Sequence, residues 1–196
     1  AKAHIASLWE ASKSEFQSNI KEVLPRLSTP AQEVFDYSLE MAPPVRAYFY
    51  VPNFLEAYNR GSTSRQDDRR YIVQGPGTST TSHLNAFRHE FAHSLTKPIV
   101  EANSDLIESK GVLFQQAPRE VTRFYRDWLT FVDECLVRAV AARVIELTSP
   151  DPGAGEALRR ADMARGFFLV GPFVEQLKVY ETSGLILREY ARSMFE

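Results

Sequence analysis

The sequence predicts an α+β fold, a mostly helical single domain with a small antiparallel or mixed sheet. With 196 residues, the chain has room for one compact domain. Hydrophobic residues make up 44% and charged residues 24%, which is typical of a globular protein and excludes disorder as the main state. Several long stretches repeat apolar residues every three or four positions, whereas only two short runs are rich in β-branched and aromatic residues. Helices are therefore expected to predominate over strands.

Two helices are expected in residues 1–44. Apolar side chains recur at helical spacing from Ile5 to Leu27, as an amphipathic helix requires. A second helix is expected from Pro30 to Met41, where Thr29 would be the N-cap and Pro43-Pro44 would stop the helix.

Two strands are expected next, from Val45 to Val51 and from Arg70 to Gln74, because both runs are rich in β-branched and aromatic residues. The segment between them, Asn59 to Arg69, is polar and rich in small residues, which predicts a solvated loop. A second loop is expected from Gly75 to Ser82.

The rest of the chain is expected to be helical. A helix that starts near Ser82 and covers Leu84 to Thr96 would end at Pro98, and a longer helix is expected from Thr122 to Leu147. The last segment, Gly155 to Glu196, predicts two or three helices. The expected breaks between them are Gly166, Gly171-Pro172 and Gly184.

The charge balance and the single cysteine exclude several classes of site. The 23 Lys and Arg against 25 Asp and Glu give a net charge of −2, so no positive field favours nucleic acid as a partner. Cys135 alone can form neither an internal disulfide nor a CxxC motif. A metal ion would therefore have to be held by histidines and carboxylates.

No membrane span and no signal peptide are expected. No window approaches 18 consecutive apolar residues, and the first twenty residues carry four charged side chains. The chain begins at Ala1, which fits either an exported or secreted protein after processing or a domain cut from a longer protein, so the compartment stays open.

The chemistry is expected from His89-Glu90-Phe91-Ala92-His93, an H-E-x-x-H arrangement within the helix that starts near Ser82. Residues four apart lie on one face of a helix, so both imidazoles can reach one metal ion. Glu90 is turned by about 100° from His89, where it can address a water molecule without binding the ion. Apolar residues on the opposite face would pack on the core. The motif predicts zinc at His89 and His93, with Glu90 as general base.

A catalytic zinc commonly has a third protein ligand. Five carboxylates later in the chain are candidates: Glu101, Asp105, Glu108, Asp133 and Glu134. Glu134 is the first choice, because it lies in a run that is apolar nearly all the way round a helix, where a buried carboxylate needs a cation as partner. An ion pair with Arg138, four residues on, is the alternative, and both arrangements can hold together. Asp133 is the second choice and Glu108 the third.

The residues around these side chains resemble the gluzincin metallopeptidases. Arg88 to Pro98 is similar to the active-site helix of that family, and Phe131 to Val140 is similar to its glutamate helix. The chain also resembles a group of poorly characterised bacterial domains predicted to be peptidases, in which a Gly-Phe segment and a Tyr-Glu pair follow. Here these would be Gly166-Phe167-Phe168 and Tyr180-Glu181.

The resemblance implies a single zincin-like metallopeptidase domain over residues 1–196, with the catalytic core in residues 45–196. The metal ligands would be His89, His93 and Glu134, and Glu90 would activate a water molecule for hydrolysis of a peptide bond. Gluzincins also use a Tyr or His to stabilise the oxyanion. The nominated residue is Tyr180, with His83 and Tyr125 as rivals.

The resemblance also implies where a substrate would bind, and two competing functions remain beside it. Gluzincins bind an extended substrate along an edge strand before the active-site helix, and the strand at Tyr71 to Val73 is the expected one. The choice between endopeptidase and exopeptidase stays open. A catalytically silent zinc-binding interaction module would keep the same ligands, and a helical binding domain without metal would require an accidental H-E-x-x-H match.

Overall fold

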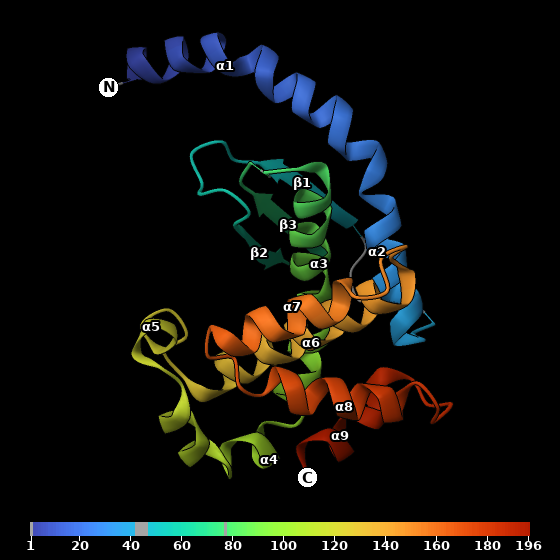
Figure 1. The fold of residues 1–196 in the computed structure, drawn as a ribbon. Helices are drawn as coiled ribbons and strands as arrows, with labels where there is room; N and C mark the ends of the chain where they lie inside the picture. The colour runs from blue at the N-terminus through green and yellow to red at the C-terminus, as the bar shows by residue number, and fades with distance from the viewer. Residues whose placement is uncertain (1, 42–46, 77) are drawn as a thin grey trace.

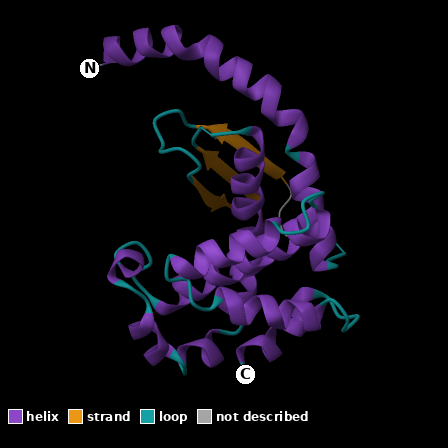
Figure 2. Cartoon of the chain, in the orientation of Figure 1, coloured by secondary structure: helices purple, strands orange, loops and turns teal. Residues whose placement is uncertain are grey.

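The computed structural model describes residues 2–41, 47–76 and 78–196. Helices predominate, and three short strands form one small mixed sheet, which confirms the predicted α+β class (Figure 2). The sheet lies beside α3, α6 runs through the helical part of the molecule, and α1 extends away from the rest (Figure 1).

The N-terminal helices form close to the expected positions. α1 spans Lys2–Val23, a short 3-10 helix covers Leu24–Arg26, and α2 spans Ser28–Ser38. The prediction of Thr29 as N-cap is wrong: Leu27 precedes α2, and Thr29 lies in its first turn with Pro30. α2 ends at Ser38, and the left-handed backbone of the next residue, Leu39, stops the helix before Met41. The expected stop at Pro43-Pro44 lies outside the described residues.

The sheet contains one strand that the sequence did not predict. β1 spans Ala47–Pro52 and β3 spans Arg69–Gln74, as expected, although the predicted start at Val45 lies outside the described residues. β2 spans Gly61–Gln66, within the segment predicted to be a loop. Its residues are small and polar, so the strand is specified by its antiparallel pairing with β3 rather than by its own side chains.

The strand order is β1-β3-β2, with β1 parallel to β3 and β2 antiparallel to it. β3 is therefore the central strand, and β1 and β2 are the edges. The alternate residues Arg70, Ile72 and Gln74 of β3 are buried, and the sheet packs on α3 through this face. The Gln74 side chain donates a hydrogen bond of 2.6 Å to the carbonyl of His83, which ties the sheet to the first turn of α3.

α3 spans Thr80–Ala102 and begins with a capping box, in which Ser79 and Ser82 each accept a hydrogen bond from the backbone N–H of the other. The predicted end at Pro98 is wrong, because the helix continues for another turn. Burial of Ile99 and Val100 in that turn offsets the hydrogen bond that Pro98 removes.

The chain between α3 and the next long helix is folded into short helical turns. α4 spans Ser104–Glu108, a 3-10 helix covers Gly111–Gln116, and α5 spans Arg119–Thr122. α6 then spans Trp128–Thr148. The expected single helix from Thr122 is therefore broken before Asp127, whose side chain caps α6 by accepting a 2.8 Å hydrogen bond from Thr130 N.

Three helices complete the chain: α7 spans Ala154–Ala164, α8 spans Val170–Tyr180 and α9 spans Leu187–Phe195. Gly166 and Gly184 lie between them, which confirms the expected breaks, and both have positive φ. The expected break at Gly171-Pro172 is wrong, since both residues lie in the first turn of α8, where proline is tolerated. α6 is buried nearly all round by α3, α7 and α8. No helix of the described residues has both the length and the apolar character that crossing a membrane requires.

Candidate metal centre

α3 places the H-E-x-x-H residues between the core and an open cleft. Phe87, Phe91 and Leu95 are buried in the core on one face of the helix, as the apolar spacing predicted. His89 and His93 lie on another face and line the cleft, which has a volume of about 1320 Å³. The amphipathic pattern of this helix thus sets the direction in which both imidazoles point.

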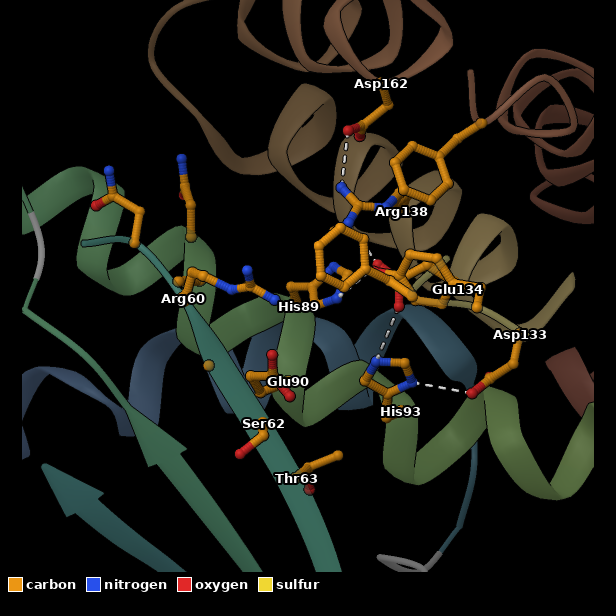
Figure 3. Close-up of a pocket in the computed structure, with 18 of the residues that line it drawn as sticks. Arg60, Ser62, Thr63, His89, Glu90, His93, Asp133, Glu134, Arg138 and Asp162 are labelled. Atoms are coloured by element: carbon orange, nitrogen blue, oxygen red, sulfur yellow. Dashed lines mark hydrogen bonds and ion pairs between the residues drawn. The ribbon is translucent and has the colours of Figure 1, made fainter. Parts of the chain in front are cut away.

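α6 brings Glu134 to the same point (Figure 3). Its Oε1 lies 3.5 Å from His89 Nε2, and its Oε2 lies 3.7 Å from His93 Nε2. One ligand atom from each of the three residues lies within 4.8 Å of the others, so the group can hold a metal ion. The structure therefore brings together the three residues predicted from the sequence as metal ligands.

The spacing of these atoms fits a metal better than direct pairing. Both nitrogen to oxygen distances exceed the usual 2.7–3.2 Å of a hydrogen bond. Ligands about 2.0–2.1 Å from a tetrahedral zinc ion lie about 3.3 Å from one another, close to the distances found here. Two histidines and a carboxylate, with one position left over, also form a donor set of the catalytic zinc type.

The charge state of the group favours metal binding. Burial lowers the pKa of His89 to about 3, so its imidazole is neutral at pH 7 and Nε2 can offer a lone pair. Burial alone would raise the pKa of Glu134, but the imidazoles and the Arg138 guanidinium lower it to about 2. A neutral imidazole and an ionised carboxylate face each other without a proton between them, which is the protonation state that a cation requires.

Asp133 supports His93 from outside the group. Its Oδ2 accepts a 3.0 Å hydrogen bond from His93 Nδ1, and its Oδ1 accepts a 2.7 Å hydrogen bond from Thr96. This contact fixes the tautomer in which His93 Nε2 is free to face Glu134. Asp133 was the second choice for the third ligand, and the structure instead places it behind the ring of His93. The other candidates, Glu101, Asp105 and Glu108, are not part of the three-residue group.

Arg138 holds Glu134 from the other side. Its guanidinium forms an ion pair with Glu134 Oε1 and a 2.8 Å hydrogen bond with Asp162, and it lies 4.0 Å over the ring of Phe167. The predicted ion pair with Arg138 and the approach to both histidines therefore occur together. Since Arg138 occupies one face of Oε1, the carboxylate is fixed in rotation and both oxygens keep their orientation toward α3.

Glu90 is buried beside this group and lines the same cleft. Burial raises the pKa of Glu90 to about 7, which is suitable for a group that takes up and returns a proton at neutral pH. The β2 strand runs directly past Glu90 (Figure 3). A Cβ atom added to Gly61 would lie 2.8 Å from Glu90 Cγ, so only glycine lets the strand approach this closely.

Tyr180 is not at the site. Its ring is buried, and its hydroxyl donates a 2.7 Å hydrogen bond to the carbonyl of Tyr37. Its rival His83 lies in the first turn of α3, and its Nε2 atom lies 2.9 Å from the Tyr50 hydroxyl. Tyr125, the other rival, lines the cleft and interacts with Glu134 and Arg138. Burial raises the pKa of Tyr125 to about 12, so its hydroxyl remains a hydrogen-bond donor.

The strand beside the site is β2, and the expectation for Tyr71 to Val73 is wrong. Those residues belong to the central strand β3, whose backbone is paired on both sides. β2 has one free edge, and residues 61–65 line the cleft. Sequence reasoning missed these residues because the segment lacks the alternation of apolar and polar residues that predicts a strand.

Comparisons with known proteins identify a family but no individual relative. No curated protein and no solved structure matches this chain. A family model described as a domain of unknown function, DUF4932, matches residues 79–186. The match begins at the N-cap of α3 and includes all of α6, the two helices that supply the candidate metal ligands. Because it covers 186 − 79 + 1 = 108 of the 196 residues, the chain belongs to the DUF4932 family.

Proposed function

We propose that this protein is a zinc-dependent peptidase of the gluzincin type. The observation that carries the proposal is the convergence of His89 Nε2 and His93 Nε2 on the two oxygens of one buried carboxylate, Glu134. Glu90 lies in the same cleft with its pKa raised to about 7. This combination of two imidazoles, one ionised carboxylate and an adjacent base suits hydrolysis better than a purely structural site, which would commonly have four protein ligands.

His89, His93 and Glu134 would hold the metal, and Asp133 and Arg138 would keep two of these side chains in position. A zinc ion bound there would polarise the carbonyl of the substrate and lower the pKa of a water molecule toward about 7. Glu90 would accept a proton from the attacking water as its oxygen bonds to the carbonyl carbon. Glu90 would then return that proton to the leaving nitrogen as the C–N bond breaks.

Tyr125 is the residue best placed to stabilise the charge that develops on the carbonyl oxygen. Its hydroxyl lines the cleft close to Glu134 and remains protonated because burial raises its pKa. A neutral donor aimed at a developing oxyanion commonly contributes about 3–4 kcal/mol to transition-state stabilisation. We therefore assign to Tyr125 the role that the sequence had suggested for Tyr180.

The free edge of β2 would bind the peptide. An extended segment can pair with the backbone of an edge strand, which gives affinity with little dependence on sequence. β2 lines the cleft next to Glu90, so a peptide paired with it would lie across the base and the metal ligands. The substrate class is accordingly an extended or unfolded polypeptide.

The variant Glu90→Gln tests the proposal. The general base is lost while the three metal ligands remain, so cleavage of an unfolded protein or a peptide library should fall by about 10²–10⁴-fold. Zinc content, measured by mass spectrometry, should stay at the wild-type level. Glu101→Gln is the matched control, because Glu101 lines the same cleft but is exposed and lies outside the ligand group.

A peptidase should show cleavage that a chelator abolishes and that zinc restores. Zinc-loaded wild-type protein that cleaves nothing in a broad peptide library would contradict the proposal and favour a silent zinc-binding module. Equal cleavage by wild type and Glu90→Gln would also contradict it, since the assigned base would then have no role.

A further inference from the structure

We propose that Arg70 forms a carboxylate-binding subsite in the cleft, so that the preferred substrate presents a carboxylate close to the bond that is cleaved. The link between this subsite and substrate cleavage rests on the proposed function. The binding site itself can be tested without turnover.

Arg70 is a buried cation that forms no ion pair within the described part of the chain. It lines the cleft, yet only 4% of its surface is exposed. Its Nε has no hydrogen-bond acceptor, and its one hydrogen bond is a long contact of 3.4 Å from Nη1 to Thr63 Oγ1. Across residues 2–41, 47–76 and 78–196, no carboxylate forms an ion pair with Arg70, and residues 1, 42–46 and 77 include no Asp or Glu.

This state is costly without a ligand. A buried charge is normally paired and hydrogen-bonded, because burial removes the stabilisation that water gives. Burial also lowers the pKa of Arg70, as expected for a cation that is short of charge compensation. Arg138, a partly buried arginine of the same cleft, contrasts with Arg70 because it pairs with two carboxylates, Glu134 and Asp162. Arg70 therefore has unused binding capacity at the wall of the cleft.

A carboxylate is the ligand that matches this capacity. Guanidinium groups bind carboxylates through two parallel N–H donors, and a bond to charged groups is about twice as strong as one between neutral groups. The other cations at this end of the cleft are Arg65, opposite Arg70 in the β2–β3 pairing, and Lys97, one turn after His93. Both are exposed.

Two carboxylates also face this end of the cleft. Asp133 is already engaged by His93 and Thr96. Glu101 is exposed and makes no ion pair among the described residues. Three cations against these two acids leave a net positive charge, which favours an incoming anion over a neutral group.

The position of Arg70 gives the expected distance from the chemistry. Gly61 of β2 lies against Glu90, and Thr63 of the same strand contacts Arg70. Two residues along a strand span about 7 Å. A peptide paired with β2 would thus present its carboxylate to Arg70 about one to two residues away from the scissile bond.

Two sources can supply this carboxylate: the C-terminus of the substrate, or an Asp or Glu side chain. The first would make the enzyme remove one or two residues from the C-terminus, and the second would make it an endopeptidase selective for acidic positions. The experiment below separates these two sources.

The binding test uses the zinc-loaded Glu90→Gln protein, which should not consume its ligands. Tetraalanine as the free acid is compared with tetraalanine amide, and acetyl-Ala-Glu-Ala-amide is compared with acetyl-Ala-Gln-Ala-amide. We expect at least tenfold tighter binding for the acid of one pair, together with a shift of the Arg70 Nε–H resonance in ¹H–¹⁵N spectra. Which pair shows the difference identifies the source.

Arg70→Gln should abolish the preference for the acid, whereas Arg65→Gln, at the paired but exposed position, should retain it. Equal affinity within both pairs for the Glu90→Gln protein, or an unmoved Arg70 resonance at saturation, would overturn the proposal without any variant of Arg70. The same titration with chelator-treated protein separates this result from the proposed function. If the acid ligand binds at Arg70 but the wild-type protein neither takes up zinc nor cleaves any peptide, the subsite is retained and the peptidase is refuted.

Discussion

Asp133 contacts the candidate metal centre through the ring of His93 and lies outside the group of candidate ligands. Each of its two oxygens accepts a hydrogen bond, one from His93 Nδ1 and one from Thr96, and it is not part of the His89, His93 and Glu134 group. A carboxylate in this position raises the basicity of the histidine and fixes its orientation. Asp133 is therefore a positioning residue.

Asp133→Asn should lower zinc affinity by about 10–100-fold, because the amide is a weaker acceptor and one of its two groups is a donor. Competition with a chelator of known affinity measures the change. Asp105→Asn is a matched control from an exposed position, and it should bind zinc like wild type. Unchanged affinity in Asp133→Asn would show that the contact with His93 does not support the metal ligand.

The buried His83, which is not one of the candidate metal ligands, should make the free energy of unfolding depend on pH. Burial lowers its pKa, and the groups that face it are the Tyr50 hydroxyl and the more distant Glu22. Since the folded pKa lies below the unfolded value of about 6.5, the unfolded chain binds a proton more readily in this range. Stability contributed by neutral His83 is therefore present above pH 6.5 and lost as the pH falls.

His83→Gln should keep a polar contact with Tyr50 but remove this dependence. The difference in free energy of unfolding between wild type and variant should change by at most about 1.4 kcal/mol for each pH unit below 6.5. Urea denaturation at pH 8.0, 6.5 and 5.5 measures the profile. Parallel profiles for the two proteins would show that His83 does not titrate with folding.

At the scale of elements, the two long helices were largely predictable and the edge strand was not. His89 and His93 are four residues apart in one helix, so their shared face follows from local geometry alone. Glu134 could be nominated because an almost wholly apolar helix predicts a buried carboxylate. β2 depends on pairing with β3, a contact between segments, and its sequence, Gly-Ser-Thr-Ser-Arg-Gln, lacks the alternation of apolar and polar residues that predicts a strand.

The sequence could not distinguish Tyr125, which lines the cleft, from Tyr180, which does not, for a similar reason. Tyr180 and Tyr125 are both tyrosines near helix ends, and only the packing of α2 on one and the cleft beside the other distinguishes them. The unpaired state of Arg70 likewise depends on how β3, β2 and α3 pack together. None of these differences leaves a pattern within a single segment.

The close approach of β2 to α3 gives a test at this scale. Gly61→Ala would place a Cβ atom 2.8 Å from Glu90 Cγ and 3.0 Å from its Oε1, so the carboxylate must move. We expect peptide cleavage to fall by at least about tenfold, because displacement of a catalytic group by about 1 Å can cost 10²-fold. Zinc content should not change. In the control Gly153→Ala the nearest atom is 3.6 Å away, and full activity in Gly61→Ala would contradict the assigned role of Glu90.

At the scale of the whole molecule, the metal would join two helices that are distant in sequence. α3 supplies two ligands and α6 supplies the third, and these helices pack against each other in the core. The unfolded chain cannot hold the three side chains together, so binding would stabilise the folded state alone. The residues that match the DUF4932 model, 79–186, contain both helices.

Zinc should accordingly raise the melting temperature. At a free zinc concentration of about 100 times Kd, the stabilisation is about 2.7 kcal/mol, which corresponds to roughly 5–10 °C for a chain of this size. Thermal melts of chelator-treated protein before and after reloading with zinc measure the shift. Glu134→Ala should show a much smaller shift, and an equal shift in that variant would place the zinc elsewhere.

The zinc content of the purified protein after dialysis tests the central claim most directly. We predict close to one zinc per wild-type chain, a severe loss in Glu134→Ala, and full retention in Glu108→Ala, whose side chain lies outside the ligand group. Wild-type protein without zinc, even after reloading, would contradict the metal site. Retention in Glu134→Ala together with loss in Glu108→Ala would show that the third ligand has been misassigned.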